Sequence, residues 1–172
     1  MYIRNMETRL VNLRYLPNQL SRKDRRLQSE ELAKSQRLYS RHKYYTRKPV
    51  RSFTSTKSKH ITTAEKRYGV SAIGATRELA NATKCSKSAL AKIINKGAGA
   101  YFSSGSRPNQ TAQSWGKARL ASAITSGKAA AVDYDILEKG CVPGSIALRL
   151  AKRAKQKYGH GTRRIPKTKV NI

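Results

Sequence analysis

The chain has 172 residues, a length that favours one domain with at most one appended segment. Its 37 lysine and arginine residues against 9 aspartate and glutamate residues give a formal net charge of +28, which repels itself unless a polyanion or an acidic partner neutralises it. No apolar run is long enough for a secretion signal or a membrane span, so we expect a protein that is made and kept on the cytosolic side.

The basic charge is concentrated at the two ends. Residues 1–60 hold 16 basic and 4 acidic residues, residues 61–140 hold 12 and 5, and residues 141–172 hold 9 and none. We therefore predict a mainly α protein, with a small helical domain between long, basic, partly extended N- and C-terminal arms. The predicted division is an N-terminal arm over 1–60, a compact helical domain over 61–141, and a basic amphipathic helix with a tail over 142–172.

The N-terminal arm is predicted to contain one long helix. Ser21 and Asp24 have the spacing of a capping box, and neither glycine nor proline follows until after Tyr45, so we expect a helix over about residues 21–45. Its apolar residues are sparse, which indicates a helix that is either solvated or docked along a partner. Residues 46–60 alternate bases with hydroxyls and are predicted to be extended.

The middle of the chain is predicted to form several helices, some of which end at a glycine. Thr62 and Thr111 are expected to open two of these helices, and Gly69, Gly97 and Gly127 are expected to close three. Small residues over 112–126 would let another backbone approach closely, which predicts a central helix. The helices are expected over 62–68, about 76–82, 86–96 and 112–126.

Near the C-terminus, Asp133 is expected to cap a brief helix that ends at Gly140. A final amphipathic helix is predicted from Pro143 to Tyr158, with Gly159 as its stop. No stretch of the chain shows the alternation of a strand.

The loop expected after Gly97 does not match the known glycine-rich phosphate-binding motifs. It lacks the Gly-Lys-Ser/Thr of a P-loop, and no strand precedes it, so nucleotide binding is not predicted. A structural loop at a helix–helix corner is favoured, although free backbone N–H groups beside Arg107 leave one phosphate or carboxylate contact open.

Trp115 and Arg119 lie one helical turn apart, and two interpretations follow. In the first, Trp115 is a core residue and Arg119 pairs with Asp133 or Asp135. In the second, the guanidinium lies against the indole and, with Arg107, forms a stacking and charge platform for a partner chain or a nucleic acid strand.

Contacts to a partner or polyanion are predicted on the basic segments, and aromatic residues among the bases (Tyr39, Tyr44, Tyr45 and Phe53) are compatible with single-strand or RNA contact. The predicted contact residues are Arg107, Trp115, Lys117, Arg119, Arg149, Lys152, Arg153, Lys155, Arg163 and Arg164.

The sequence predicts no catalytic, cofactor or metal site. His42, His60 and His160 are scattered, without the spacing of metal ligands. A nuclease that uses these histidines with Asp133 and Asp135 is the weakest of the alternatives. The two cysteines, Cys85 and Cys141, are compatible with a disulfide or with free thiols in a reducing compartment.

The block Tyr101-Phe-Ser-Ser-Gly-Ser-Arg-Pro-Asn-Gln-Thr-Ala-Gln-Ser-Trp-Gly-Lys-Ala-Arg-Leu-Ala-Ser122 resembles an uncharacterised family of small basic proteins. That family is encoded by large double-stranded DNA viruses of algae and protists, with shorter relatives in tailed phages. The segments Tyr15-Leu-Pro-Asn-Gln-Leu-Ser-Arg-Lys-Asp24 and Tyr44-Tyr-Thr-Arg are similar to its N-terminal half, and the likeness extends over roughly residues 13–141.

This resemblance implies a viral setting and no chemistry. The expected function is a structural virion protein, a minor or internal capsid component that bridges neighbouring capsid subunits with its basic arms, which would become ordered through this assembly. The alternative is a nucleic-acid-binding or genome-condensing protein without base readout, and a DNA-processing enzyme ranks last. The expected partners are capsid proteins and viral DNA, and the expected location is the virion, with host cytoplasm or nucleus during assembly.

Overall fold

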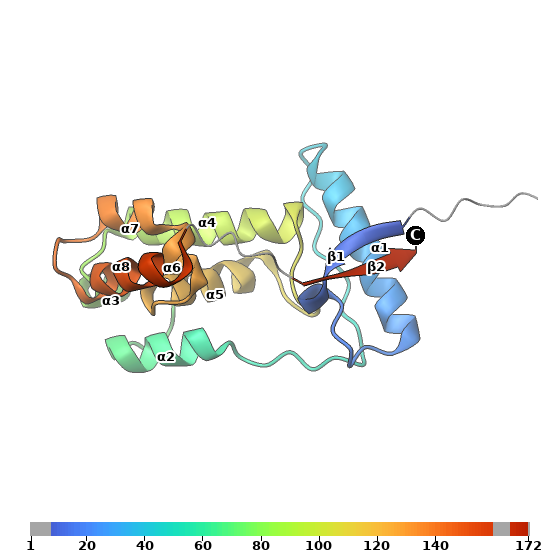
Figure 1. Ribbon diagram of the computed structural model, residues 1–172, viewed down its shortest axis with the longest axis horizontal. Helices are drawn as coiled ribbons and strands as arrows, with labels where there is room; N and C mark the ends of the chain where they lie inside the picture. The colour runs from blue at the N-terminus through green and yellow to red at the C-terminus, as the bar shows by residue number, and fades with distance from the viewer. Residues whose placement is uncertain (1–7, 160–165, 172) are drawn as a thin grey trace, which may run out of the picture. The chain divides into compact units, whose positions relative to one another are not determined.

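The computed structural model describes residues 8–159 and 166–171, and within these ranges the chain is mainly helical, as predicted (Figure 1). The elements in chain order are β1 (Thr8–Asn12), the 3-10 helix η1 (Leu13–Tyr15), α1 (Arg22–Tyr39), α2 (Lys59–Tyr68), α3 (Arg77–Thr83), α4 (Lys87–Ser103), α5 (Ala112–Ile124), α6 (Lys128–Val132), α7 (Tyr134–Gly140), α8 (Ile146–Tyr158) and β2 (Lys167–Asn171). None of the helices in these ranges has both the length and the apolar run that crossing a bilayer requires.

The chain divides into two compact units, and the division differs from the predicted one. The first unit is drawn from Met1–Ser55, Ala100–Thr111 and Arg164–Ile172, and the second from Thr56–Gly99 and Ala112–Arg163. The prediction placed the final helix outside the compact helical domain, whereas α8 packs on α5, α6 and α7 within the second unit.

A two-stranded antiparallel sheet in the first unit joins segments far apart in the sequence. Thr8 pairs with Asn171 and Asn12 with Lys167, and the N–H of Leu13 donates to the carbonyl of Pro166 at 2.9 Å. The expectation that the chain has no strand was therefore wrong. The pairing depends on a partner more than 150 positions away along the chain, which the local pattern of either segment does not reveal.

Helix α1 begins as predicted and ends earlier than predicted. The Ser21 hydroxyl accepts a hydrogen bond from the N–H of Asp24 at 3.2 Å, which caps the first turn. The helix ends at Tyr39 because the chain turns at His42, whose φ is +57°. Its buried face includes Leu32, which is fully buried within the first unit. Leu32 and Tyr15 lie so close to Gly105 (φ +127°) that no side chain would fit at that position.

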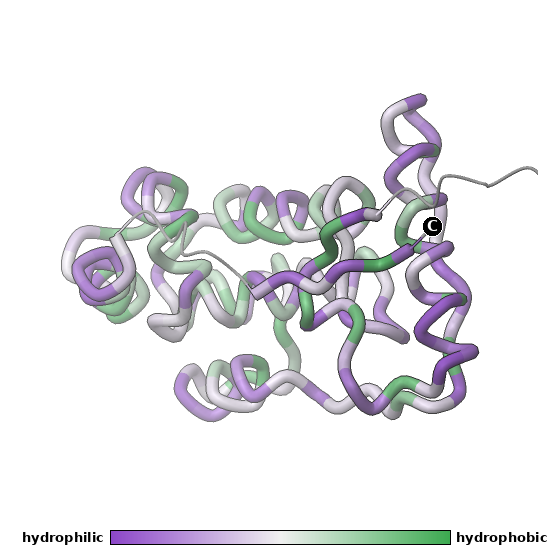
Figure 2. The backbone as a smooth tube through the Cα atoms, turned by 45° about the vertical axis from the view of Figure 1, so that its right-hand side comes forward, coloured by the Kyte–Doolittle hydropathy of each residue, from purple (hydrophilic) through white to green (hydrophobic). Residues whose placement is uncertain are grey.

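The second unit is a helical bundle with one continuous apolar core, and its helices alternate hydrophobic and hydrophilic residues along their length (Figure 2). Helix α2 packs on α5, where the Tyr68 hydroxyl donates to the carbonyl of Ile124 at 2.7 Å. The largest fully buried side chains of this core are Leu79, Leu90, Ile93, Leu120, Ile124 and Leu137.

The predicted start of α2 is wrong, and its predicted end is confirmed. Ser58, rather than Thr62, caps the helix by accepting a hydrogen bond from the N–H of His60, so the helix begins at Lys59. Gly69 follows its last residue with a φ of +62°, the left-handed conformation that glycine adopts without strain.

Helix α4 does not end at Gly97 but continues to Ser103, which corrects the predicted glycine-rich loop. A Cβ atom at Gly97 would lie 2.6 Å from the Cα of Gly116 on α5, and a Cβ at Gly116 would lie 2.5 Å from the carbonyl oxygen of Ile94. Both glycines therefore serve a close contact between two helix backbones. This confirms the prediction that the small residues of α5 admit another backbone, and Leu120, Ala121 and Ala123 of α5 are fully buried.

A disulfide between Cys85 and Cys141 joins the start of α4 to the end of α7. Around it the N–H of Ser86 donates to the carbonyl of Gly140, and the N–H of Val142 donates to the carbonyl of Lys84, each at 2.8 Å. Of the two alternatives for the cysteines, the structure has the disulfide and not the free thiols.

Helix α8 starts later than predicted. Pro143 lies before it, in an exposed turn completed by Gly144 with a φ of +82°, and Ser145 caps the helix by accepting from the N–H of Leu148 at 3.3 Å. The helix ends at Tyr158 with Gly159 following, as predicted.

Candidate functional site

The solvent face of α8 carries a dense group of basic side chains. Ala147, Leu148, Ala151 and Ala154 are buried on its other face, so small side chains seat the helix closely on the bundle. No acidic residue occurs in the helix. The bases on its solvent side, all exposed, are Arg149, Lys152, Arg153, Lys155 and Lys157.

One of these bases also has a contact within the unit. The ammonium group of Lys155 lies 4.2 Å from the centre of the Tyr134 ring on α7, an arrangement in which the ring face attracts the cation. Arg149, Lys152 and Arg153 are spaced three and four residues apart, so they are neighbours on one side of the helix. These three form the part of the predicted contact set that the structure brings together.

Arg119, another predicted contact residue, is used inside the second unit. Its Nε and Nη2 atoms donate to the carboxylate of Asp133 at 2.7 and 2.9 Å, and Lys96 Nζ donates to the same carboxylate at 2.6 Å. The side chain of Asp133 is fully buried, and that of Arg119 is 22% exposed. The pairing of Arg119 with Asp133 in the first interpretation is therefore confirmed, whereas Trp115 is half-buried and not the core residue that this interpretation expected.

This ion group also explains a missing cap. Asp133 precedes α7, as predicted, but its side chain makes no capping hydrogen bond because both carboxylate oxygens accept from Lys96 and Arg119. Two cations around one carboxylate leave a net positive charge at this point, and the ammonium of Lys96 remains about half exposed.

The remaining predicted contact residues lie apart along the chain. Arg107 is exposed in the first unit, while Trp115 and Lys117 are half-buried on α5 in the second. Arg163 and Arg164 lie outside the described residues.

A buried arginine was missed by the sequence reasoning. Arg47 donates from Nη1 to the carbonyl of Tyr101 at 2.7 Å and to Ser35 Oγ at 3.1 Å, and from Nη2 to Ser106 Oγ at 2.7 Å. Its guanidinium lies over the Tyr101 ring, 3.7 Å from the centroid. Burial lowers the pKa of Arg47 from its ordinary value, although guanidinium groups stay protonated in proteins. Within a run of bases, nothing in the sequence distinguishes Arg47 from its exposed neighbours.

The aromatic residues among the bases separate into two kinds. Tyr45 faces inward, where its hydroxyl donates to the Glu31 carboxylate at 2.9 Å. Tyr39 and Tyr44 instead meet Phe102, with ring centroids 6.0 and 5.2 Å from that of Phe102. Tyr44 is 74% exposed, so this cluster is open to solvent on one side. Phe102 was not predicted as part of it, because it was assigned to a loop far away in the sequence.

The residues considered for a nuclease do not come together in the described parts of the chain. Asp133 is occupied by its two cations, and no three His, Cys, Asp or Glu side chains in residues 8–159 and 166–171 are grouped to hold a metal ion. His60 lies beside Gly127, and burial lowers the pKa of His60.

A family model described as "Family of unknown function (DUF5824)" matches residues 12–138, well over half of the chain, and the chain therefore belongs to that family. No curated protein and no solved structure matches the chain.

Proposed function

We propose that this member of the DUF5824 family is a non-catalytic structural protein that binds nucleic acid through phosphate contacts, without base readout, inside a virus particle. The observation that carries the proposal is the solvent face of α8, where five exposed bases occur without any acid. The net charge of +28 gives the same indication for the whole chain.

The packing of α8 suits this role. Because its buried face is seated on α6 and α7, the helix holds its bases in place before any ligand arrives. Basic side chains that contact phosphates release the counterions condensed on the nucleic acid, and this supplies affinity that is independent of sequence. Nothing in this mechanism requires a reaction.

The proposal is tested by titrating labelled duplex DNA with the full chain at several salt concentrations. Replacing Arg149, Lys152 and Arg153 by glutamine should weaken binding to every sequence alike. If all three contact phosphates, the slope of log affinity against log salt should fall by about 2.7. A matched control replaces Arg22, Lys23 and Arg26 by glutamine, which removes the same charge from exposed positions of α1.

Two results would overturn the proposal. One is an affinity too weak to measure at about 0.15 M salt, since non-specific binding by so basic a protein is expected to persist there. The other is an equal loss of affinity in the α1 control, which would mean that binding follows net charge alone and that α8 has no special part in it.

The viral setting rests on the resemblance of the block Tyr101–Ser122, and bridging of capsid subunits is the second candidate function. Exposed apolar side chains beside the start of α8, Val142 (58% exposed) and Ile146 (45%), support a protein contact there. The first unit gives less support for bridging of capsid subunits. The face of α1 that carries Leu32 is already buried within that unit and needs no neighbouring protein to cover it.

Mass spectrometry of purified particles, with cross-linking before digestion, tests this setting. A structural virion protein should be present at a fixed ratio to the capsid proteins, and a bridging protein should also be cross-linked to them. Absence from the particle would remove the viral role and leave nucleic-acid binding to be judged on its own titration.

A further inference from the structure

The first unit presents a second surface with a different chemistry. Tyr39, Tyr44 and Phe102 form a cluster in which the Tyr39 and Phe102 rings are stacked at an interplanar angle of 13°, and the Tyr44 ring meets the edge of both. Tyr39 and Phe102 are half-buried, whereas Tyr44 is 74% exposed. A large ring surface is therefore left in water beside two rings that support it.

The backbone on both sides of Tyr44 is held by hydrogen bonds. After α1 ends, His42 adopts a φ of +57°, and the N–H of Lys43 donates back to the carbonyl of Leu38 at 2.9 Å. Three residues after Tyr44, the buried Arg47 donates a hydrogen bond to the carbonyl of Tyr101, which precedes Phe102 in the sequence. Both sides of Tyr44 are thus held.

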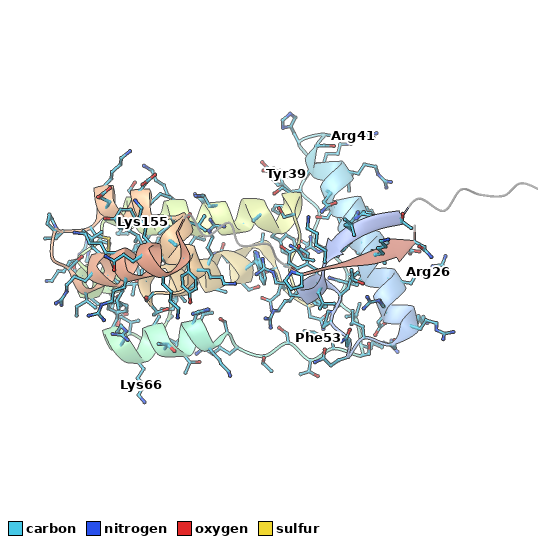
Figure 3. The ribbon with its side chains drawn as sticks, viewed as in Figure 1. Arg26, Tyr39, Arg41, Phe53, Lys66 and Lys155 are labelled. Atoms are coloured by element: carbon cyan, nitrogen blue, oxygen red, sulfur yellow. A yellow bond between two sulfur atoms is a disulfide. The ribbon has the colours of Figure 1, made fainter. Side chains whose placement is uncertain are left out.

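Basic residues are neighbours of Tyr39 and Tyr44 in the sequence. Arg37, Arg41 and Lys43 are exposed, and Tyr39 and Arg41 lie at the same end of α1 (Figure 3). No acidic residue occurs between Leu32 and Ala64 in the sequence. The surface is therefore both aromatic and cationic.

The described acids of the first unit are already occupied elsewhere. Asp24 accepts from the hydroxyl and N–H of Ser52, Glu30 pairs with Arg26, and Glu31 accepts from Tyr45 and Lys48. None of these carboxylates forms a salt bridge with Arg37, Arg41 or Lys43, so these exposed bases are open to an anionic ligand.

We propose that this aromatic–basic surface (Tyr39, Tyr44 and Phe102 with Arg41 and Lys43) binds single-stranded nucleic acid, with a base stacked on Tyr44 and the adjoining phosphates on Arg41 and Lys43. The inference deepens the proposed function and rests on it. Bases in a duplex have their faces covered by their neighbours, so only an unpaired strand offers a face to an exposed ring. Stacking of this kind is sequence-tolerant, because every base has a π-face.

The test uses the full chain, a labelled oligo(dT) strand and a labelled duplex of the same length, with affinities measured by fluorescence anisotropy. Tyr44→Ala should weaken binding to the single strand about tenfold, within the range known for loss of one base–aromatic stack, and leave duplex affinity unchanged. Tyr44→Phe, which keeps the ring, should bind like the parent protein. Because Tyr44 is mostly exposed, its replacement should not unfold the chain.

Charge and ring are separated by two further variants. Lys43→Gln should lower the salt slope for the single strand by about 0.7, whereas Tyr44→Ala should leave that slope unchanged. Val132→Ala, which truncates an exposed apolar residue (43% exposed) in the second unit, should change neither affinity.

The outcomes distinguish this inference from the proposed function. If the α8 variant loses affinity and Tyr44→Ala does not, the single-strand surface is wrong and the proposed function stands. An equal loss of single-strand and duplex affinity in Tyr44→Ala also overturns the surface. If Tyr44→Ala instead abolishes self-association in sedimentation, the cluster contacts a second copy of this chain and the inference fails. If neither nucleic acid binds, both proposals fail together.

Discussion

The carboxylate of Asp133 has no exposed surface and is held by Lys96 and Arg119. A buried charge without partners is far more costly than a buried pair, so the two cations and the carboxylate depend on one another. Arg119 is therefore not available as a free contact group, although its position on α5 made it a reasonable candidate. Arg119 and Arg149 are the same residue type, but Arg119 is paired with the buried Asp133 whereas Arg149 is exposed.

Replacing Asp133 by alanine should lower the free energy of unfolding by about 3 kcal/mol, because two cations then lose their common partner. This figure is at the lower end for a broken buried pair, since Lys96 is about half exposed and can be hydrated. Chemical denaturation measures the change. Asp135→Ala is the matched control, since Asp135 is exposed on the same helix and its loss should cost less than about 1 kcal/mol. Equal costs for the two variants would contradict the assigned role of Asp133.

The contact between α4 and α5 shows why a glycine is ambiguous in a sequence. Gly97 follows an apolar-faced stretch, and glycine is common just past the end of a helix, so a stop was predicted. In the structure the helix continues, and Gly97 lies against Gly116 of a helix that starts fifteen residues later. A stop is a local property, whereas a close backbone contact depends on a partner helix, and only the first is visible in a local pattern.

Gly97→Ala should destabilise the chain even though alanine is the better helix former. The new Cβ would lie 2.6 Å from the Cα of Gly116 and 3.2 Å from the Cβ of Arg119, and neither atom can move without shifting a helix. The cost of overpacking, about 1–3 kcal/mol, exceeds the gain of about 1 kcal/mol from helix propensity. Thermal unfolding of the two variants measures the effect. Asn95→Ala, at an exposed position of the same helix, should be neutral or slightly stabilising. A stabilised Gly97→Ala variant would show that the two helices tolerate separation.

Elements defined by their own residues were predicted well, and elements defined by distant partners were not. Ser21, Gly69 and Gly159 each mark a helix boundary through a bond or a backbone angle of the residue itself, and all three were identified. The strand pair β1–β2 joins opposite ends of the chain and left no local trace. The basic face of α8 was likewise visible from its spacing, whereas the cluster at Tyr44 needed Phe102, 58 positions away in the sequence.

At the scale of the whole molecule, strong self-repulsion is opposed by a covalent bond. The Cys85–Cys141 disulfide closes a loop with a sequence separation of 56 residues, which contains α4 to α7. The helix α8 follows directly after the loop, so the bond also fixes where this basic helix begins. The cross-link therefore encloses part of the less charged middle of the chain, next to the more basic C-terminal segment.

Removing the disulfide should cost about 4 kcal/mol of unfolding free energy in the chain-entropy description. The double variant Cys85→Ala, Cys141→Ala is compared with the parent protein by denaturation, with and without a reductant. The reductant should lower the stability of the parent to near that of the variant and leave the variant unchanged. A parent protein that is indifferent to the reductant would mean that the bond contributes nothing to stability.

The same closed loop has a mechanical consequence. When the chain is stretched from its two termini, tension passes through the sulfur–sulfur bond and bypasses the segment between the cysteines, whose sequence separation is 56. The contour length released on forced unfolding should then be shorter by about 190 Å than in the reduced chain. Pulling would extend α8 and the segments before Cys85 while the enclosed helices bear no load.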